Sequence, residues 1–184
     1  MSGAGADGSE GSGGRPAPAP RVRRAFLSLG SNLGERAAAL RAARAALAAL
    51  PGTVVVAASR VYETAPQDLA GQPPFLNQVV CLDTGLEPRE LLAAAQRIEV
   101  DAGRVRTVRF GPRTLDVDIL LLEGVASDDP ELTVPHPRLW QRAFVLVPLA
   151  ELWQHARGMP AADVKALADE LAPSQDVSLY AAED

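Results

Sequence analysis

The sequence predicts an α+β fold, in which a mostly antiparallel sheet carries helices on one face. Short runs rich in Val, Leu and Ile alternate with longer stretches rich in Ala and Leu. The short runs suit buried strands and the longer ones suit helices. Gly and Pro separate the stretches, which gives the order strand–helix–strand–strand–helix–strand before a C-terminal tail.

The first half of this order is set by side-chain spacing. Residues 22–30 alternate in polarity as a strand does, and residues 35–50 place leucines at helical intervals. A Val-rich strand is expected over 53–62. A loop with three prolines over 63–74 is long for a plain connection, so we interpret it as functional. The next strand is expected over 75–84.

The second half begins with a helix over 86–102, which has Pro88 near its start and Gly103 after its end. We expect an arginine-rich loop over 104–112, a strand over 116–122, a hairpin or loop over 124–131, a short helical stretch ending near Pro148, a helix over 160–171, and a strand or tail over 177–180. The strand and helix order is that of the split βαβ, ferredoxin-like fold.

The bulk composition indicates a single globular domain. The chain has 184 residues, 47% hydrophobic and 22% charged, with a net charge of -5. The acidic balance argues against a general nucleic-acid binder, and no apolar run is long enough to cross a membrane. We expect residues 1–20 to be a disordered Gly-, Ala- and Pro-rich tail, and 21–184 to form one domain. With one cysteine and no sorting signal, we expect a cytoplasmic protein.

The stretch from Arg109 to Leu122 carries the chemistry. Asp116 and Asp118 share one face of the predicted strand, since strand side chains alternate. Two neighbouring carboxylates are typical of a Mg²⁺ site that also holds substrate phosphates. Arg104 and Arg113 lie upstream and suit phosphate oxygens, so the stretch favours phosphoryl transfer. The alternative is an Arg–Asp ion-pair network with no catalytic role.

Three other features allow two interpretations each. Phe75 and Asn77 share a strand face, where they could stack on a flat heterocycle and read its edge, or Phe75 could be a core residue. His136, between two prolines, could contact phosphate or be structural. The turn at 30–34 could cradle a phosphate, or it could be an ordinary turn capped by Ser31 or Asn32. The only lysine, Lys165, excludes the P-loop signature.

Several blocks of sequence together resemble a known family. They are Gly30-Ser31-Asn32-Leu33, Pro73-Pro74-Phe75-Leu76-Asn77, Gln96-Arg97-Ile98-Glu99, Gly103-Arg104-Val105-Arg106, Gly111-Pro112-Arg113-Thr114-Leu115-Asp116-Val117-Asp118, Leu132-Thr133-Val134-Pro135-His136, and Arg142-x-Phe144. From about residue 22 to 149 the chain is similar to the 6-hydroxymethyl-7,8-dihydropterin pyrophosphokinases of folate biosynthesis. Phe110 stands where that family usually has Trp.

The resemblance implies a ferredoxin-like enzyme that moves pyrophosphate from ATP to the hydroxymethyl oxygen of a reduced pterin, releasing AMP. It implies two Mg²⁺ ions on Asp116 and Asp118, with Arg104 and Arg113 acting on the transferred phosphates. The pterin contacts implied are Thr64, Ala65, Phe75, Asn77 and Phe144. The nucleotide contacts implied are Gln96, Glu99, Arg106, Phe110, Ile119, Thr133, His136 and Arg142. We expect a monomer with ATP and the pterin as partners, and neither nucleic acid nor membrane.

Two other classes of function share this predicted fold. An RNA-binding module would place aromatic residues on its central strands and present a basic face. Aromatic content is only 4%, and the Asp pair would repel a phosphate backbone. A small-molecule regulatory domain of the same shape would need a partner domain, for which the chain has no room. Both are less consistent with the residues than phosphoryl transfer.

Overall fold

The computed structural model describes residues 21–66, 71–104 and 111–181. Its strands are β1 (Arg23–Ser31), β2 (Thr53–Ala58), β3 (Tyr62–Thr64), β4 (Phe75–Thr84), β5 (Asp116–Leu122), β6 (Ser127–Asp129), β7 (Leu132–Val134) and β8 (Val177–Leu179). Its helices are α1 (Arg36–Ala48), α2 (Pro88–Asp101), α3 (Ala143–Leu152) and α4 (Val164–Leu171), with 3-10 turns η1 (Leu139–Gln141), η2 (Trp153–His155) and η3 (Ala172–Ser174).

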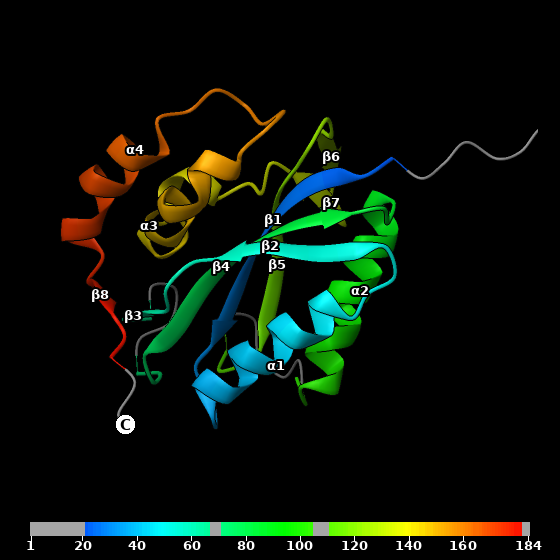
Figure 1. Ribbon diagram of the computed structural model, residues 1–184. Helices are drawn as coiled ribbons and strands as arrows, with labels where there is room; N and C mark the ends of the chain where they lie inside the picture. Colours follow the sequence, from blue (N-terminus) through cyan, green and yellow to red (C-terminus); the bar gives the residue numbers. More distant parts are fainter. Residues whose placement is uncertain (1–20, 67–70, 105–110, 182–184) are drawn as a thin grey trace, which may run out of the picture.

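In the main sheet, β1 lies between β5 and β4 (Figure 1). The strand order is β5-β1-β4-β3-β8, and β2 also pairs with β4. Each of these pairs is antiparallel, as the sequence predicts. The alternation in β1 sends Leu27 and Leu29 to one face and Phe26 and Ser28 to the other.

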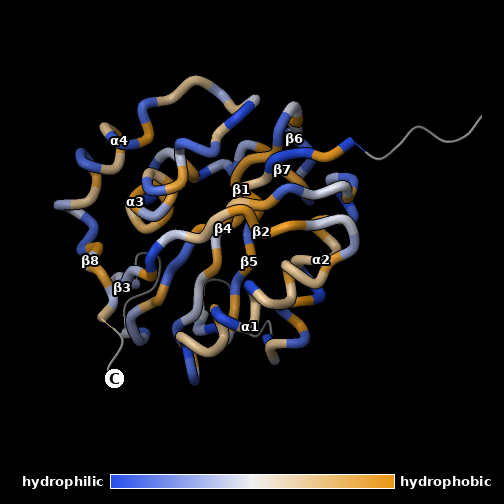
Figure 2. The backbone as a smooth tube through the Cα atoms, in the orientation of Figure 1, coloured by the Kyte–Doolittle hydropathy of each residue, from blue (hydrophilic) through white to orange (hydrophobic). Residues whose placement is uncertain are grey.

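Helices α1 and α2 cover the first face of the sheet and form the larger core with it. Figure 2 shows apolar residues along the central strands beneath them. A capping box starts α2, because the Glu87 N–H donates to Glu90 Oε2 at 2.8 Å and Pro88 opens the first turn. Gly103, at a φ of 77°, ends it in the left-handed region that glycine adopts freely.

The second face is not left bare, which corrects the expectation that helices cover only one face. Helices α3 and α4 pack against Phe26, Val79 and Cys81 at one end of the sheet. Helix α3 is apolar nearly all round, which suits a helix enclosed between the sheet and α4. The other end of this face carries a cavity.

Three boundaries differ from prediction, and one is the start of the helix expected over 160–171, which lies at Val164. The strand expected over 53–62 is two strands, because Ser59 accepts from the Val79 N–H through its hydroxyl at 3.0 Å and interrupts the ladder. Helix α3 does not end near Pro148 but continues to Leu152. Burial of its apolar side chains compensates for the hydrogen bond that the backbone nitrogen of Pro148 cannot donate. The stretch at 177–179 is a strand on β3, and β6 and β7 form the predicted hairpin.

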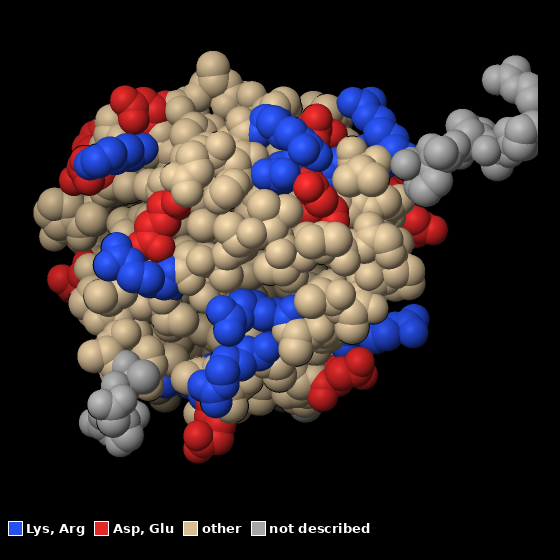
Figure 3. All heavy atoms as spheres, viewed as in Figure 1, with Lys and Arg blue, Asp and Glu red and all other residues tan. Residues whose placement is uncertain are grey.

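Within residues 21–66, 71–104 and 111–181, no helix is long and apolar enough to span a membrane. On the face in Figure 3, basic and acidic side chains lie in mixed groups with broad uncharged areas between them. Ion pairs between opposite charges include Arg157–Asp83, at 2.9 Å.

Candidate active site

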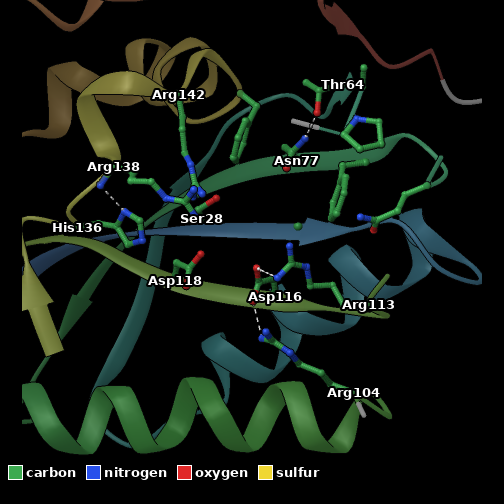
Figure 4. Close-up of a pocket in the computed structure, with 16 residues that line it drawn as sticks. Ser28, Thr64, Asn77, Arg104, Arg113, Asp116, Asp118, His136, Arg138 and Arg142 are labelled. Atoms are coloured by element: carbon green, nitrogen blue, oxygen red, sulfur yellow. Dashed lines mark hydrogen bonds and ion pairs between the residues drawn. The ribbon is translucent and has the colours of Figure 1, made fainter. Parts of the chain in front are cut away.

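A cavity of about 230 Å³ lies on the second face, beyond the end of α3 (Figure 4). It is small for a ligand site, but it has a polar lining on one side and aromatic rings on the other. Its lining residues are Ser28, Gly30, Thr64, Ala65, Pro66, Gln72, Phe75, Asn77, Arg104, Arg113, Asp116, Asp118, His136, Arg138, Arg142 and Phe144.

Strand β1 forms the floor. In the antiparallel register Gly30 lies between Asn77 of β4 and Asp116 of β5, and Ser28 lies opposite Asp118. Paired residues in neighbouring strands point to the same face, so the register alone brings these side chains together. A Cβ on Gly30 would lie 3.4 Å from Asn77 Oδ1, so the glycine keeps the floor open.

Asp116 and Asp118 project from β5 into the cavity on the predicted shared face. Asp116 is held by two arginines: Arg104 forms an ion pair with one oxygen, and Arg113 Nη1 lies 3.2 Å from the other. Arg104, at the end of α2, also pairs with the buried Glu99, which accepts from the Val117 N–H at 2.8 Å. The Arg–Asp network proposed as an alternative therefore exists, inside a cavity.

Burial dominates the electrostatics of the acidic end. It raises the pKa of Asp118 to about 6, helped by the negative charge of Asp116 and opposed by three nearby arginines. Burial also raises the pKa of Glu99 to about 7, against the hydrogen bond from Val117 N–H and the charge of Arg104. Both carboxyls hold a proton more readily than exposed ones because burial disfavours the charged form.

The opposite end of the cavity is aromatic and amide-lined. Phe75 opens β4 and Phe144 lies in the first turn of α3, so the rings come from different walls. The Arg113 guanidinium lies 5.4 Å from the Phe75 ring centroid. Buried Asn77 donates from Nδ2 to Thr64 Oγ1 at 2.8 Å, which fixes the plane of its amide. A flat polar ring would find both stacking surfaces and a hydrogen-bonding edge here.

His136 lines the cavity as a neutral ring. Its Nδ1 accepts from the Arg138 N–H at 3.2 Å, so its proton is on Nε2. Burial lowers its pKa to about 4, assisted by the charges of Arg142 and Arg138. The Arg142 guanidinium lies 5.2 Å from the Phe144 ring centroid. Together these groups make the third side of the cavity a cluster of hydrogen-bond donors.

Asn32 ties the cavity's loops together, and neither it nor Ser31 caps α1, which was one interpretation of the turn at 30–34. Helix α1 has Glu35 as its N-cap, without a side-chain hydrogen bond. The Asn32 N–H donates to the Arg113 carbonyl at 3.2 Å, so it is not presented to a phosphate. Its side chain accepts from the Arg113 N–H at 2.8 Å and donates to Gln72 and to the Pro73 carbonyl. Asn32 thereby positions Arg113.

The expected site residues that meet in the cavity are Thr64, Ala65, Phe75, Asn77, Arg104, Arg113, Asp116, Asp118, His136, Arg142 and Phe144. Four others do not line it: Glu99 lies behind Arg104, Ile119 belongs to the core of the first face, Gln96 is exposed on α2, and Thr133 lies on β7. Arg106 and Phe110, and most of the arginine-rich loop predicted over 104–112, lie outside the described residues.

Among the described residues, sequence reasoning missed five that line the cavity, namely Ser28, Gly30, Pro66, Gln72 and Arg138. Ser28 and Gly30 had a signal: they are the small residues that alternate with leucines in a strand buried on both faces. Gln72 and Pro66 belong to the loop over 63–74, which was expected to be functional but in which only Thr64 and Ala65 were named as contacts. Arg138 had no signal beyond its place near His136.

Comparison with known proteins identifies the family of this chain. The family model described as 7,8-dihydro-6-hydroxymethylpterin-pyrophosphokinase (HPPK) matches residues 26–154. A Pseudomonas aeruginosa 2-amino-4-hydroxy-6-hydroxymethyldihydropteridine pyrophosphokinase is 50% identical over 131 residues, which are 71% of this chain and 81% of that protein. The Bacillus subtilis protein of the same name is 47% identical over 130 residues, 71% of this chain and 78% of that protein.

Solved structures share the fold at lower identity. The Plasmodium falciparum HPPK-DHPS A437G crystal structure with pteroate matches with a TM-score of 0.62 at 13% identity. The match covers 85% of this chain and 44% of that one, so this chain spans less than half of the Plasmodium protein. With a family model matching more than half of its length and relatives near 50% identity, the chain belongs to the 7,8-dihydro-6-hydroxymethylpterin-pyrophosphokinase family.

Proposed function

We propose that the cavity binds a reduced pterin alcohol and the phosphates of ATP, and transfers pyrophosphate between them in folate biosynthesis. The pterin hydroxymethyl oxygen attacks the β-phosphorus of ATP. A new oxygen–phosphorus bond forms, the bond from the β-phosphorus to the bridging α–β oxygen breaks, AMP leaves, and the hydroxyl proton is released. The observation that carries the proposal is one cavity with a carboxylate pair at one end and an aromatic–amide slot at the other.

The slot suits the pterin. Phe75 and Phe144 offer two ring faces from different walls. Asn77 has one amide hydrogen engaged by Thr64, which leaves its other N–H and its carbonyl oxygen for the edge of a heterocycle. Because Asn77 lies opposite Gly30, and Gly30 lies opposite Asp116, the bound ring would end close to the acidic side.

The donor set at the acidic end fits Mg²⁺. Within the described residues no three His, Cys, Asp or Glu side chains gather as a potential metal site. Two carboxylates suffice for Mg²⁺, which keeps water and substrate phosphate as its other ligands. Asp116 and Asp118 would hold it, and the metal would neutralise phosphate charge at the transferring group. Burial and, after it, the charge of Asp116 raise the pKa of Asp118, and a bound cation would relieve the repulsion between the two carboxylates.

The arginines orient the phosphates. Arg104 and Arg113 approach Asp116 from α2 and from the segment before β5, so their guanidinium groups lie beside the proposed transfer point. Asn32 fixes the backbone of Arg113, which reduces the entropic cost of holding the Arg113 guanidinium in place. His136 and Arg142 supply donors on the remaining side and suit the rest of the triphosphate.

The finer architecture is also a proposal. The order β5-β1-β4-β2, with α1 and α2 on one face, supports a split βαβ, ferredoxin-like core to which β3, β8, α3 and α4 are added. We further propose that the chain acts as a cytoplasmic monomer, with residues 21–184 as its catalytic domain. Light scattering on the purified protein tests the monomer.

Product analysis tests the function. The protein, ATP, Mg²⁺ and 6-hydroxymethyl-7,8-dihydropterin are incubated, and the nucleotides are separated by chromatography. We expect AMP in equal amount to the pterin diphosphate, and none without the pterin. Formation of ADP, or no pterin-dependent turnover, would refute the proposal. The control is Gln154→Leu, which changes an exposed residue of η2 outside the cavity.

A further inference from the structure

The chain beyond α3 folds back over two walls of the cavity. We call residues 163–180 the C-terminal arm; it lies after residues 26–154, which the family model matches. Helix α4 packs on α3 through buried Val164 and Ala168. Strand β8 then pairs with β3, placing Val177 opposite Thr64 (Figure 1). The arm therefore contacts both the helix that carries Phe144 and the strand that carries Thr64.

Gln175, between these two contacts, caps α3. Its Oε1 accepts from the Ala143 N–H at 2.8 Å, and its Nε2 donates to the Gln141 carbonyl at 3.1 Å. The first N–H groups of a helix have no partner within the helix, and the side chain of the N-cap residue Arg142 does not cap those of α3. The capping group therefore comes from 32 residues further along the chain.

The two bonds from Gln175 fall on either side of Arg142. One bond is to the carbonyl of Gln141, just before Arg142, and the other is to the N–H of Ala143, just after it. Arg142 and Phe144 both line the cavity, and the Arg142 guanidinium lies 5.2 Å from the Phe144 ring centroid. Fixing the backbone here fixes the direction from which the Phe144 ring enters the slot.

The opposite wall is tied to the same short segment. The Tyr180 N–H donates to the Val61 carbonyl at 3.0 Å, and β8 runs alongside β3 as far as Thr64. Only Asp176 separates Gln175 from β8, and its φ of 46° makes the connection a tight turn. Asp tolerates this left-handed conformation better than most residues. A link this short sets the spacing between the two walls.

We propose that Gln175 is a positioning residue for the pterin slot, acting through the first turn of α3. This rests on the proposed function, because the slot is the one assigned to the pterin. An aromatic slot binds a flat ring well only at a narrow range of spacings. Removing the cap frees the end of α3 that carries Phe144, and it weakens pterin binding without touching the pterin.

Three variants test the role. Gln175→Leu keeps the side-chain bulk and removes both hydrogen bonds. Gln175→Glu keeps the acceptor for the Ala143 N–H and places a negative charge at a helix N-terminus, where it is favourable. Gln154→Leu makes the same Gln-to-Leu change at an exposed position away from the arm. Calorimetry measures the pterin Kd for each at a temperature where circular dichroism shows every variant folded.

We expect Gln175→Leu to weaken pterin binding about fivefold, the ratio that corresponds to loss of one helix cap, and Gln175→Glu to recover most of that loss. Gln154→Leu should bind as the wild type does. Should Gln175→Leu not fold, Gln175→Asn, whose amide is one methylene too short, carries the same expectation.

A purely structural role would lower the unfolding temperature and leave the Kd of the folded protein unchanged, which would overturn the inference. Equal weakening in Gln175→Leu and Gln175→Glu would also overturn it. If the wild type bound no pterin and formed no AMP, the proposed function itself would fail. If the wild type binds the pterin and Gln175→Leu binds it with the same Kd, only the inference about Gln175 is refuted.

Discussion

Gly30→Ala separates the stability of the fold from the function of the cavity. Gly30 is extended, not left-handed, so its backbone accepts alanine. The new Cβ would lie 3.4 Å from Asn77 Oδ1, 3.8 Å from Asp116 Cβ and 4.0 Å from Phe75 Cδ1. The last two are ordinary contacts, and the first requires the Asn77 amide to move by a few tenths of an ångström.

The two consequences have opposite signs. Glycine within a strand costs about 0.5–1 kcal/mol of stability relative to alanine, so the free energy of unfolding of the variant should equal that of the wild type or be slightly higher. The methyl group fills the floor of the slot and displaces the amide that is set by Thr64. We therefore expect the pterin KM to rise roughly tenfold, about 1.4 kcal/mol of binding.

Urea unfolding gives the free energy of unfolding, and steady-state kinetics on the same preparation give the pterin KM. Ala43→Gly in α1 is the control for stability alone, because it lies in the core of the first face, away from the cavity. Loss of stability in Gly30→Ala with an unchanged pterin KM would show that the glycine serves the fold and not the slot. The assigned place of the pterin would then be wrong.

Three further predictions concern individual side chains. NMR titration of His136 should give a pKa of about 4. Between pH 4 and 6.5 the unfolded state, with a pKa near 6.5, binds more protons than the folded state, so the contribution of His136 to the free energy of unfolding should rise over this range and be level above it. A titration midpoint near 6.5 would contradict the burial of His136. Asn32→Ala removes three hydrogen bonds from a buried site and should lower the free energy of unfolding, measured in urea, by about 3 kcal/mol. A decrease of less than about 1 kcal/mol would show that Asn32 does not hold Arg113 in place. Asp116→Ala should abolish AMP formation with an unchanged circular dichroism spectrum, since Arg104 keeps its Glu99 partner; near-normal turnover would exclude Asp116 as a metal ligand.

Strand periodicity predicted much of the site because it is a local property. The two-residue alternation placed Asp116 with Asp118, and Phe75 with Asn77, before any pairing was known. The antiparallel register then brought the two pairs onto one face, with β1 between them. Spacing could therefore predict which of these side chains lie together, whereas the role of each was inferred from the resemblance to a known family.

What failed depends on contacts between distant residues. Ser59 breaks a Val-rich strand only because Val79 of β4 bonds its hydroxyl. Pro148 is tolerated because α3 is enclosed by the sheet and α4, which no local pattern reveals. The cap from Gln175 joins residues more than thirty positions apart, and the turn at Asn32 serves Arg113 instead of its own helix.

The most direct test of the account is a crystal structure with Mg²⁺, a non-hydrolysable ATP analogue and the pterin alcohol. We predict metal bound by both carboxylates of β5, the pterin ring between Phe75 and Phe144, and its hydroxymethyl oxygen facing the β-phosphorus. A complex in which the nucleotide phosphates lie away from Asp116 and Asp118, with no cation on either, would contradict it.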